Sequence, residues 1–414
     1  MENSVFQKNQ SLLTINKLLS ILLIFFIVII VSEGLYYYFF IHKKSTPIFK
    51  SDLKQNQSSS TSTFKPQKEE KKYLEIAAST LDWLNQQKDD RGVYFFAQLY
   101  QSSQKQYENL PSGESGHYGL TTIWGRFKYF QATNDKKIFN LLKNDLNTYT
   151  DKNKVKYIQN DFWNCKLMYE LWQSNLFSNK EKKLIENICW QRSSYLYPEE
   201  LLQAIDGKTS LNKKEFVDLD LEKAITKQLI FDKPLDQDEI NLIFNFFPYP
   251  SDFAFRYLWK KDEKDLKIAR YYFYQLIHLF TEKEEEIKKH NAEGLKNFCL
   301  LGIDSLDLYK ATNKDSYLKF ALFLGEKILK EEKTKLKPPV CVFFANQLFK
   351  TTGKKEFEEI KKNLLDSLIN QVLDIPSFPG NLTGKGGFLL DERGNPGPIK
   401  VIRENGLLVG LLSQ

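Results

Sequence analysis

Apolar residues recur with the spacing of an α-helix along most of the chain beyond Tyr73. In residues 136–149 and 354–372 they fall on one face, while lysine, glutamate and asparagine fill the other. Residues 317–329 are instead apolar on most sides, as expected of a helix that its neighbours cover. The alternation of half-exposed helices with covered ones predicts that the helices form two concentric layers. The pattern therefore predicts an all-α fold.

A short phrase recurs where one predicted helix gives way to the next: an aromatic residue, Thr three positions later, then Asn or Gly. It occurs at residues 130–139, 309–317 and 349–357. Asn and Gly tolerate the left-handed backbone conformation that ends many helices, so we predict helix ends at Asn134, Asn313 and Gly353. The last two copies begin 40 residues apart, at 309 and 349, about the length of one helical hairpin.

This phrase resembles the hairpin junctions of (α/α) toroid proteins, among them the six-hairpin glycosidases, the unsaturated glucuronyl hydrolases and the N-acylglucosamine 2-epimerases. A second likeness lies at residues 81–94, LDWLNQQKDDRGVY, which is similar to a W-L-x-x-Q-x-x-x-G phrase of helical toroids. The resemblance implies an (α/α) toroid of helical hairpins over residues 73–414. This resemblance supports a fold more strongly than it supports a reaction, because proteins of one fold catalyse many different reactions.

The helical pattern is interrupted near the C-terminus. Residues 388–390, a DERGN turn and residues 399–402 have the composition of a β-hairpin, which we expect to close the ring. The last helix then begins around Glu404.

The N-terminal part differs from the rest. Residues 18–41 are an apolar run of 24 residues, which at about 1.5 Å per residue can cross a hydrocarbon core of about 30 Å. We predict a short tail at 1–17, a transmembrane anchor in the lipid bilayer at 18–41 and a flexible polar linker at 42–72. A cleaved signal peptide is the alternative, with Ser32 and Gly34 as the small residues before the cut.

The charge of the chain is concentrated in this N-terminal part. Residues 1–72 hold ten lysines and five acidic residues, so they carry +5 of the net charge of +7. The body is nearly neutral, which disfavours nucleic acid as a partner. Two lysines precede the span and four follow it closely, which favours a body inside the cell. A short leading tail and a Ser/Thr-rich spacer favour export instead, and we expect the body outside.

Several classes of site are disfavoured by what the sequence lacks. It has no GxGxxG, Walker-type, HExxH or GxSxG motif and only four histidines, so we predict no metal and no cofactor. The four cysteines are widely spaced, each in an apolar stretch: Cys165, Cys189, Cys299 and Cys341. We expect buried free thiols there, with a disulfide as the open alternative.

Carboxylates and aromatic residues at predicted helix starts remain as candidates for chemistry. The resemblance implies a pocket at one end of the toroid, where sugar rings stack on Trp or Tyr and paired carboxylates perform acid–base work. The catalytic candidates are Glu114, Asp161 and Glu404. The candidates for substrate binding are His117, Trp124, Arg126, Trp163, Arg403 and Asn405.

Each of these positions also has a simpler structural interpretation. Asp161 is placed to cap the helix that follows it, and Ser251 or Asp252 to cap a helix that begins near Pro250. Glu404 lies where a ring-closing hairpin meets the last helix. No spacing in the sequence pairs an acid with a base.

The sequence thus predicts a membrane-anchored, carbohydrate-active protein that resembles glycoside hydrolases or sugar epimerases and uses carboxylates on a poly- or oligosaccharide. The alternative is a non-catalytic toroid that binds a glycan or a protein at the cell surface.

Overall fold

The computed structural model describes residues 68–101, 103–104, 106–113, 116–156, 158, 163–190, 250–282, 291–330, 337–373, 386–391 and 396–414. Internal contacts divide the chain into Met1–Lys65 and Pro66–Gln414, and all described residues belong to the second unit. The predicted membrane span at 18–41 lies outside the described residues. Within them, no helix is both long and apolar enough to cross a membrane.

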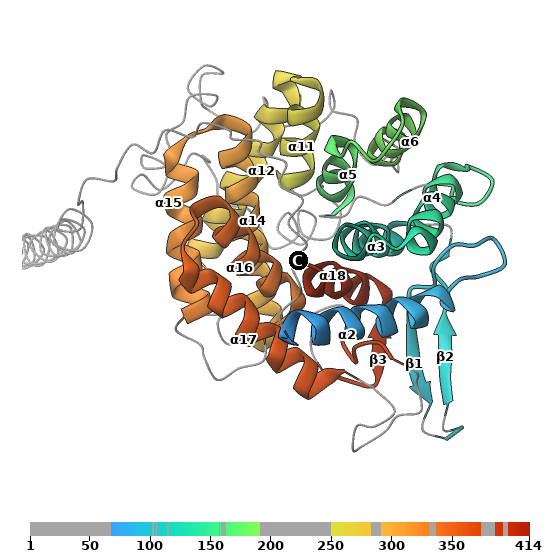
Figure 1. The fold of residues 1–414 in the computed structure, drawn as a ribbon. Coiled ribbons are helices and arrows are strands. Elements are labelled where there is room, and N and C mark those ends of the chain that lie inside the picture. Colours follow the sequence, from blue (N-terminus) through green and yellow to red (C-terminus); the bar gives the residue numbers. More distant parts are fainter. Residues whose placement is uncertain are drawn as a thin grey trace, which may run out of the picture. The chain divides into compact units, whose positions relative to one another are not determined.

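Helices form an inner ring in which each contacts the next and the last contacts the first (Figure 1). Its members, in ring order, are α3 (Leu120–Thr133), α5 (Asn164–Gln173), α11 (Pro250–Lys260), α14 (Asn291–Thr312), α16 (Pro339–Thr352) and α18 (Ile402–Leu412). Most side chains of α3, α16 and α18 are buried, as expected of helices that neighbours cover on several sides.

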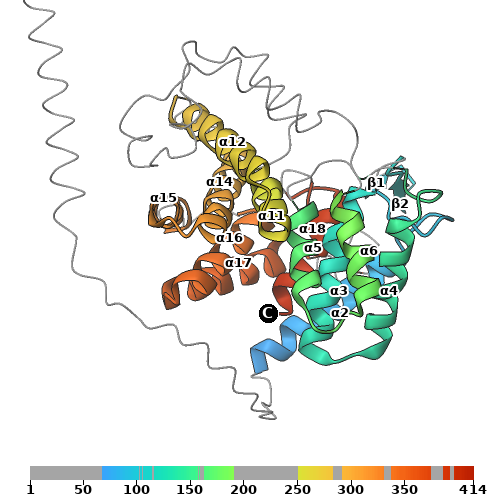
Figure 2. The same cartoon turned by 90° about the horizontal axis from the view of Figure 1, so that it is seen from above.

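A second layer covers this ring (Figure 2). Each outer helix packs mainly on the inner helix that precedes it in the chain, and α12 also contacts α14. The outer helices are α4 (Lys136–Thr150), α6 (Asn179–Trp190), α12 (Glu263–Glu282), α15 (Asp315–Leu324) and α17 (Lys355–Val372). A π-helical turn, η3 (Gly325–Lys330), continues α15. The predicted two-layer arrangement of helices is confirmed.

The first and last described helices form the remaining pair. Helix α2 (Lys68–Asn85) packs on the outside of α18, so the two ends of the body meet in one hairpin-like unit. The hydroxyl of Tyr73 donates to Asp366 at 2.9 Å and ties α2 to its other neighbour, α17. Because α2 begins at Lys68, residues 68–72 of the predicted linker are helical.

The three predicted helix ends are confirmed and share one geometry. Asn134, Asn313 and Gly353 have φ values of 56°, 56° and 68°, and each backbone amide donates to the carbonyl of the aromatic residue four positions earlier at 2.7 Å. The threonine of the phrase donates to the main chain of the helix and accepts from the amide two residues on, as Thr133 does with Tyr129 and Asp135. The phrase therefore marks the turn from an inner helix to its outer partner.

A fourth turn has this geometry without the phrase. Lys261 adopts a φ of 56°, and its amide donates to the carbonyl of Tyr257 at 2.7 Å, between α11 and α12. Sequence reasoning missed it because lysine replaces Asn or Gly and the threonine is absent.

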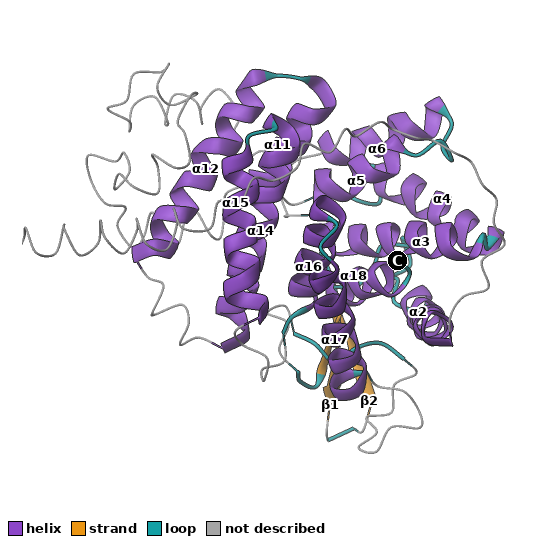
Figure 3. Cartoon of the chain, turned by 60° about the vertical axis from the view of Figure 1, so that its left-hand side comes forward, coloured by secondary structure: helices purple, strands orange, loops and turns teal. Residues whose placement is uncertain are grey.

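A small antiparallel sheet lies beside the start of α18 (Figure 3). Its order is β2 (Gln106–Leu110), β1 (Ala97–Gln101), β3 (Ile399–Val401), with Ala97 opposite both Leu110 and Val401. The predicted C-terminal hairpin is thus only partly present. A single bridge joins Leu390 to Pro396, while β3 takes its main partner from the N-terminal part of the body.

All four cysteines are paired, so the expectation of free thiols was wrong. Cys165–Cys189 joins α5 to its outer partner α6, and Cys299–Cys341 joins α14 to the neighbouring inner helix α16. Burial in apolar helices fits a free and a paired cysteine equally well. Only the packing of the helices brings the members of each pair together.

Replacing Gly410 by Ala tests the close packing of α18. A Cβ atom at Gly410 would overlap the ring of Trp124, and overpacking a core typically costs about 1–3 kcal/mol. We expect chemical denaturation to show a loss of that size. Gly397→Ala is the matched control, because its Cβ would meet nothing within 4 Å. Equal stability of the two variants would contradict the packing.

Candidate functional site

All inner helices begin at the same end of the ring, because each is joined to the next through an antiparallel outer helix. The sequence-derived candidates cluster at these starts. His117 lies in the short helix η2 (His117–Gly119) before α3, Trp163 directly precedes α5, and Arg403 to Asn405 form the first turn of α18. Glu114 and Asp161 belong to the same chain regions but lie outside the described residues.

Aromatic side chains fill the interior of the ring below this end. Trp163 and Trp124 both pack on Phe343 of α16, at ring-centroid distances of 4.9 and 5.6 Å. Helix α16 neighbours neither α3 nor α5, so these contacts cross the interior. Only 5% of Trp163 and 1% of Trp124 is exposed. A sugar ring could stack on neither side chain without displacing others.

Glu404 lies nearer the end where the helices begin. Its Oε1 is 3.3 Å from Arg403 Nη2 and 4.0 Å from Nζ of Lys296 on α14. Because α16 separates α14 from α18 in the ring, the pair with Lys296 joins two inner helices that are not ring neighbours. The Glu404 side chain is 5% exposed, against 14% and 18% for the two cations. We call these three residues the mouth cluster.

The side chains of Asn405 and Arg126 both make contacts inside the protein. The Asn405 side chain donates to the carbonyls of Phe388 and Val401 and accepts from the Phe388 amide, which fastens the segment before β3 to α18. Arg126 is fully buried and pairs with Asp145 of α4. It therefore lies between the two layers. His117 is buried as well, with 6% of its surface exposed.

The Asp145 carboxylate is the centre of this buried interlayer network. Besides Arg126 it accepts hydrogen bonds from Lys88 at 2.5 Å and from the hydroxyl of Tyr94 at 3.0 Å. Burial, and then the charge of Arg126, lowers the pKa of Lys88 to about 7. The network joins α3 and α4 to the segment that follows α2.

A second buried cluster was not foreseen from the sequence. Ser251 at the start of α11 contacts two carboxyl groups of α14, with Oγ 2.5 Å from Asp304 Oδ1 and 2.7 Å from Asp307 Oδ2. Lys166 of α5 donates to both oxygens of Asp307. Burial raises the pKa of Asp304 to about 8. We call Lys166, Ser251, Asp304 and Asp307 the interior network.

The sequence signal for this network is two acids in a mostly apolar stretch of α14. Asp304 and Asp307 are three positions apart in the stretch LLGIDSLDL, so they share one helical face. Two carboxylates on a covered face need buried partners. The sequence does not say which residues supply them.

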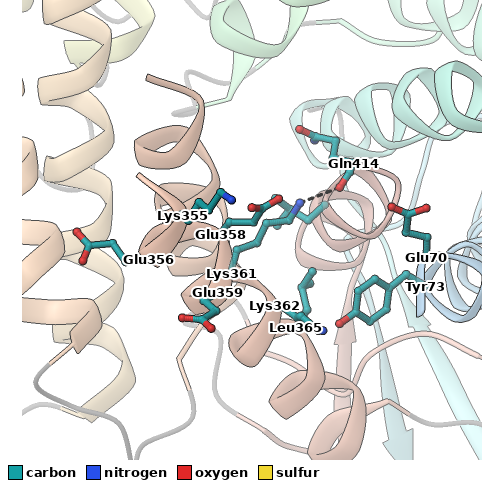
Figure 4. A pocket seen from close by; sticks show the side chains of 11 residues that line it. Glu70, Tyr73, Lys355, Glu356, Glu358, Glu359, Lys361, Lys362, Leu365 and Gln414 are labelled. Atoms are coloured by element: carbon teal, nitrogen blue, oxygen red, sulfur yellow. Dashed lines mark hydrogen bonds between the residues drawn. The ribbon is translucent and has the colours of Figure 1, made fainter. Parts of the chain in front are cut away.

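A groove of about 510 Å³ lies between α2 and α17, at the end of the ring where the inner helices finish (Figure 4). Its lining charges are mixed: Lys355, Lys361, Lys362, Glu356, Glu358 and Glu359 come from α17 and Glu70 from α2. Lys361 donates to the main-chain oxygen of Gln414 at 2.8 Å. None of the predicted site residues lines this groove.

Comparison with solved structures identifies the architecture. A variant of unsaturated glucuronyl hydrolase from Streptococcus agalactiae superposes with a TM-score of 0.51 at 11% identity, over 89% of this chain and 96% of the other. The chain shares the (α/α) toroid fold of this enzyme. Another variant of that enzyme, in complex with dGlcA-GalNAc6S, gives 0.50 at 10% identity, over 89% and 97%.

A glycoside hydrolase family 76 mannosidase from Bacteroides thetaiotaomicron gives a TM-score of 0.48 at 9% identity, over 83% of this chain and 97% of the other. No family model and no curated protein sequence matches the chain. The likeness therefore concerns the fold. Among the described residues, the mouth cluster and the interior network are two of the polar groupings that join inner helices.

Replacing Asp145 by Asn tests the interlayer network of the toroid. The substitution leaves Lys88 and Arg126 without a negative partner in a buried site, which typically costs about 3–5 kcal/mol. We expect the free energy of unfolding, measured by chemical denaturation, to fall by about 3 kcal/mol. Asp82→Asn, at an exposed position on α2, is the control. A loss no greater than that of the control would contradict the structural role of Asp145.

Proposed function

We propose that this protein is a carbohydrate-active toroid of the glycosidase-like type, which takes an oligo- or polysaccharide at the end where the inner helices begin. The observation that carries the proposal is the mouth cluster. Two non-neighbouring inner helices bring a buried carboxylate and two partly exposed cations together there. The fold shared with unsaturated glucuronyl hydrolase, one structure of which holds dGlcA-GalNAc6S, supports a saccharide as the ligand.

Glu404 is the proposed catalytic carboxylate of this site. Its Oε1 lies 3.3 Å from Arg403 and 4.0 Å from Lys296, and we propose that it acts as a base or a nucleophile. Arg403 and Lys296 can also donate hydrogen bonds to polar groups of a sugar. Asp161 and Glu114 remain the candidates for the second carboxyl group, since they precede α5 and α3.

Glu404→Gln tests the catalytic proposal. We expect the parent to cleave a member of a panel of cell-wall and exopolysaccharide fragments that includes dGlcA-GalNAc6S. In the variant kcat should fall by about 10²–10⁴-fold, while the fold is retained. Glu358→Gln on the exposed face of α17 is the matched control and should keep its rate. Unchanged turnover in Glu404→Gln would remove this residue from the mechanism.

A second candidate function is binding without catalysis, as a surface module for a glycan. The filled interior favours it, because Trp124, Trp163 and Phe343 occupy the space below the mouth cluster. The same panel separates the two functions. Binding without cleavage by the parent would favour the module, and no binding to any fragment would contradict both.

We also propose that the span at 18–41 anchors the protein and that the toroid lies outside the cytoplasm. The two disulfides support this side, because such bonds persist in oxidising compartments and are rare where glutathione keeps thiols reduced. They weigh against the lysine count around the span, which favoured the inside.

Thiol labelling tests the proposed side. Host cells lysed directly into denaturant with a maleimide should yield protein labelled at none of its four cysteines, and labelled at all four after prior reduction. Cys165→Ser frees Cys189 and serves as the positive control. Protein recovered from the membrane fraction would fit an anchor rather than a cleaved signal. Labelling of the parent without reductant would contradict an extracytoplasmic body.

A further inference from the structure

The starts of two inner helices are capped by their neighbours rather than by their own residues. The amide of Cys165, in the first turn of α5, donates to Asp252 of α11 at 3.2 Å. The amide of Ser251, in the first turn of α11, donates to Asp304 of α14 at 2.9 Å. First-turn amides have no partner within their own helix, so these bonds satisfy them from outside. The caps also fix α5 to α11 and α11 to α14.

The interior network continues this chain of caps. Lys166, one residue after the capped Cys165, reaches past α11 to Asp307 of α14, and Ser251 links Asp307 to Asp304. None of the four side chains is more than about 5% exposed. The Lys166 ammonium also lies 5.3 Å from the ring of Phe343, which places it toward the filled interior.

The hydrogens available in the interior network indicate which of its two carboxyl groups carries a proton. The Ser251 hydroxyl carries one hydrogen but approaches two carboxyl oxygens, so it can donate to only one of them. The second contact requires a hydrogen on a carboxyl group. Lys166 donates to both oxygens of Asp307, so Asp307 is the acceptor of the network. The hydrogen therefore belongs on Asp304, which donates to Ser251, which in turn donates to Asp307.

Charge and hydrogen-bond balance agree with that assignment. With Asp304 neutral, the network holds one cation and one anion, whereas a second ionised carboxyl would leave an uncompensated buried charge. Asp304 Oδ2 is buried and has no hydrogen-bond partner among the described residues, a costly position for a charged oxygen. The charges that act on Asp304 are Asp307 of its own helix and Lys166 of α5, while Asp252 of α11 is bonded to Cys165.

We propose that Asp304, protonated, is a positioning residue that holds the first turns of α5 and α11 in place at the end of the toroid where the saccharide site is proposed. Its loss of the proton at alkaline pH would set two negative charges against one cation and loosen both turns from α14. The link between this positioning and a saccharide rests on the proposed function. The proton on Asp304 and the protection of the two helix starts can be measured without any ligand.

Amide hydrogen exchange of the whole chain, compared between the parent and Asp304→Asn, tests the proposal. Since the pKa of Asp304 is raised, the folded protein binds more protons than the unfolded chain between about pH 4 and 8, so stability falls as the pH rises. We expect parent protection factors at Cys165 and Ser251 to fall about tenfold between pH 6 and 7, inside this window. In Asp304→Asn, an uncharged isostere, they should change less than about twofold.

Two further variants complete the experiment. Asp304→Ala should lose protection at pH 6, where Asp304→Asn keeps it, because only Asn preserves the acceptor for the Ser251 amide. Asp315→Asn, at an exposed position on α15, should behave as the parent. If Asp304→Ala does not fold, the parent and Asp304→Asn still decide the outcome.

Two results would overturn the proposal. The first is that the protection factors of the parent change no more with pH than those of Asp304→Asn. The second is that the Cys165 and Ser251 amides of Asp304→Asn have already lost protection at pH 6. Either would leave the proposed function untouched, whereas failure of the parent to bind any saccharide of the panel would remove that function and leave the exchange result standing.

Discussion

The close approach of α18 to α3 is the contact on which the closed ring depends. Helix α18 enters between α16 and α3 and at the same time carries α2 on its outer side. Glycines make this possible: a Cβ at Gly125 would meet the carbonyl of Gly406, and one at Gly410 would overlap Trp124. Side chains at these positions would hold the backbones apart, and the ring would stay open at the seam between its first and last helices.

Local sequence signals predicted the features that local chemistry decides. The left-handed ends at Asn134, Asn313 and Gly353 follow from a short phrase, because the residue that turns the chain and the threonine that bonds it are neighbours. Apolar composition was a poorer guide, because residues 317–329 were expected to form a covered helix. In the structure α15 lies in the outer layer and Phe323 is 54% exposed. Lys261 shows the limit, since a less favourable residue can adopt the same turn when packing requires it.

Features that join distant segments could not be predicted from one sequence. Strand β3 was expected to pair with its neighbour in the chain, but the edge of β1 binds it more extensively. The caps of α5 and α11 come from other helices, so a search for capping residues just before each helix misses the acceptor. Trp124 and Trp163 were expected in a pocket, yet the ring interior needs bulky side chains to fill it.

The pairing of α2 with α18 also sets the order in which the body can fold. These helices come from opposite ends of the folded region, so their contact closes a very long loop and belongs to the slow, non-local class. Until residues 402–412 have been synthesised, α2 and α3 expose the apolar faces that α18 later covers. A growing chain carries that surface uncovered while residues 134–401 are synthesised, a stage at which exposed apolar surface favours misassembly.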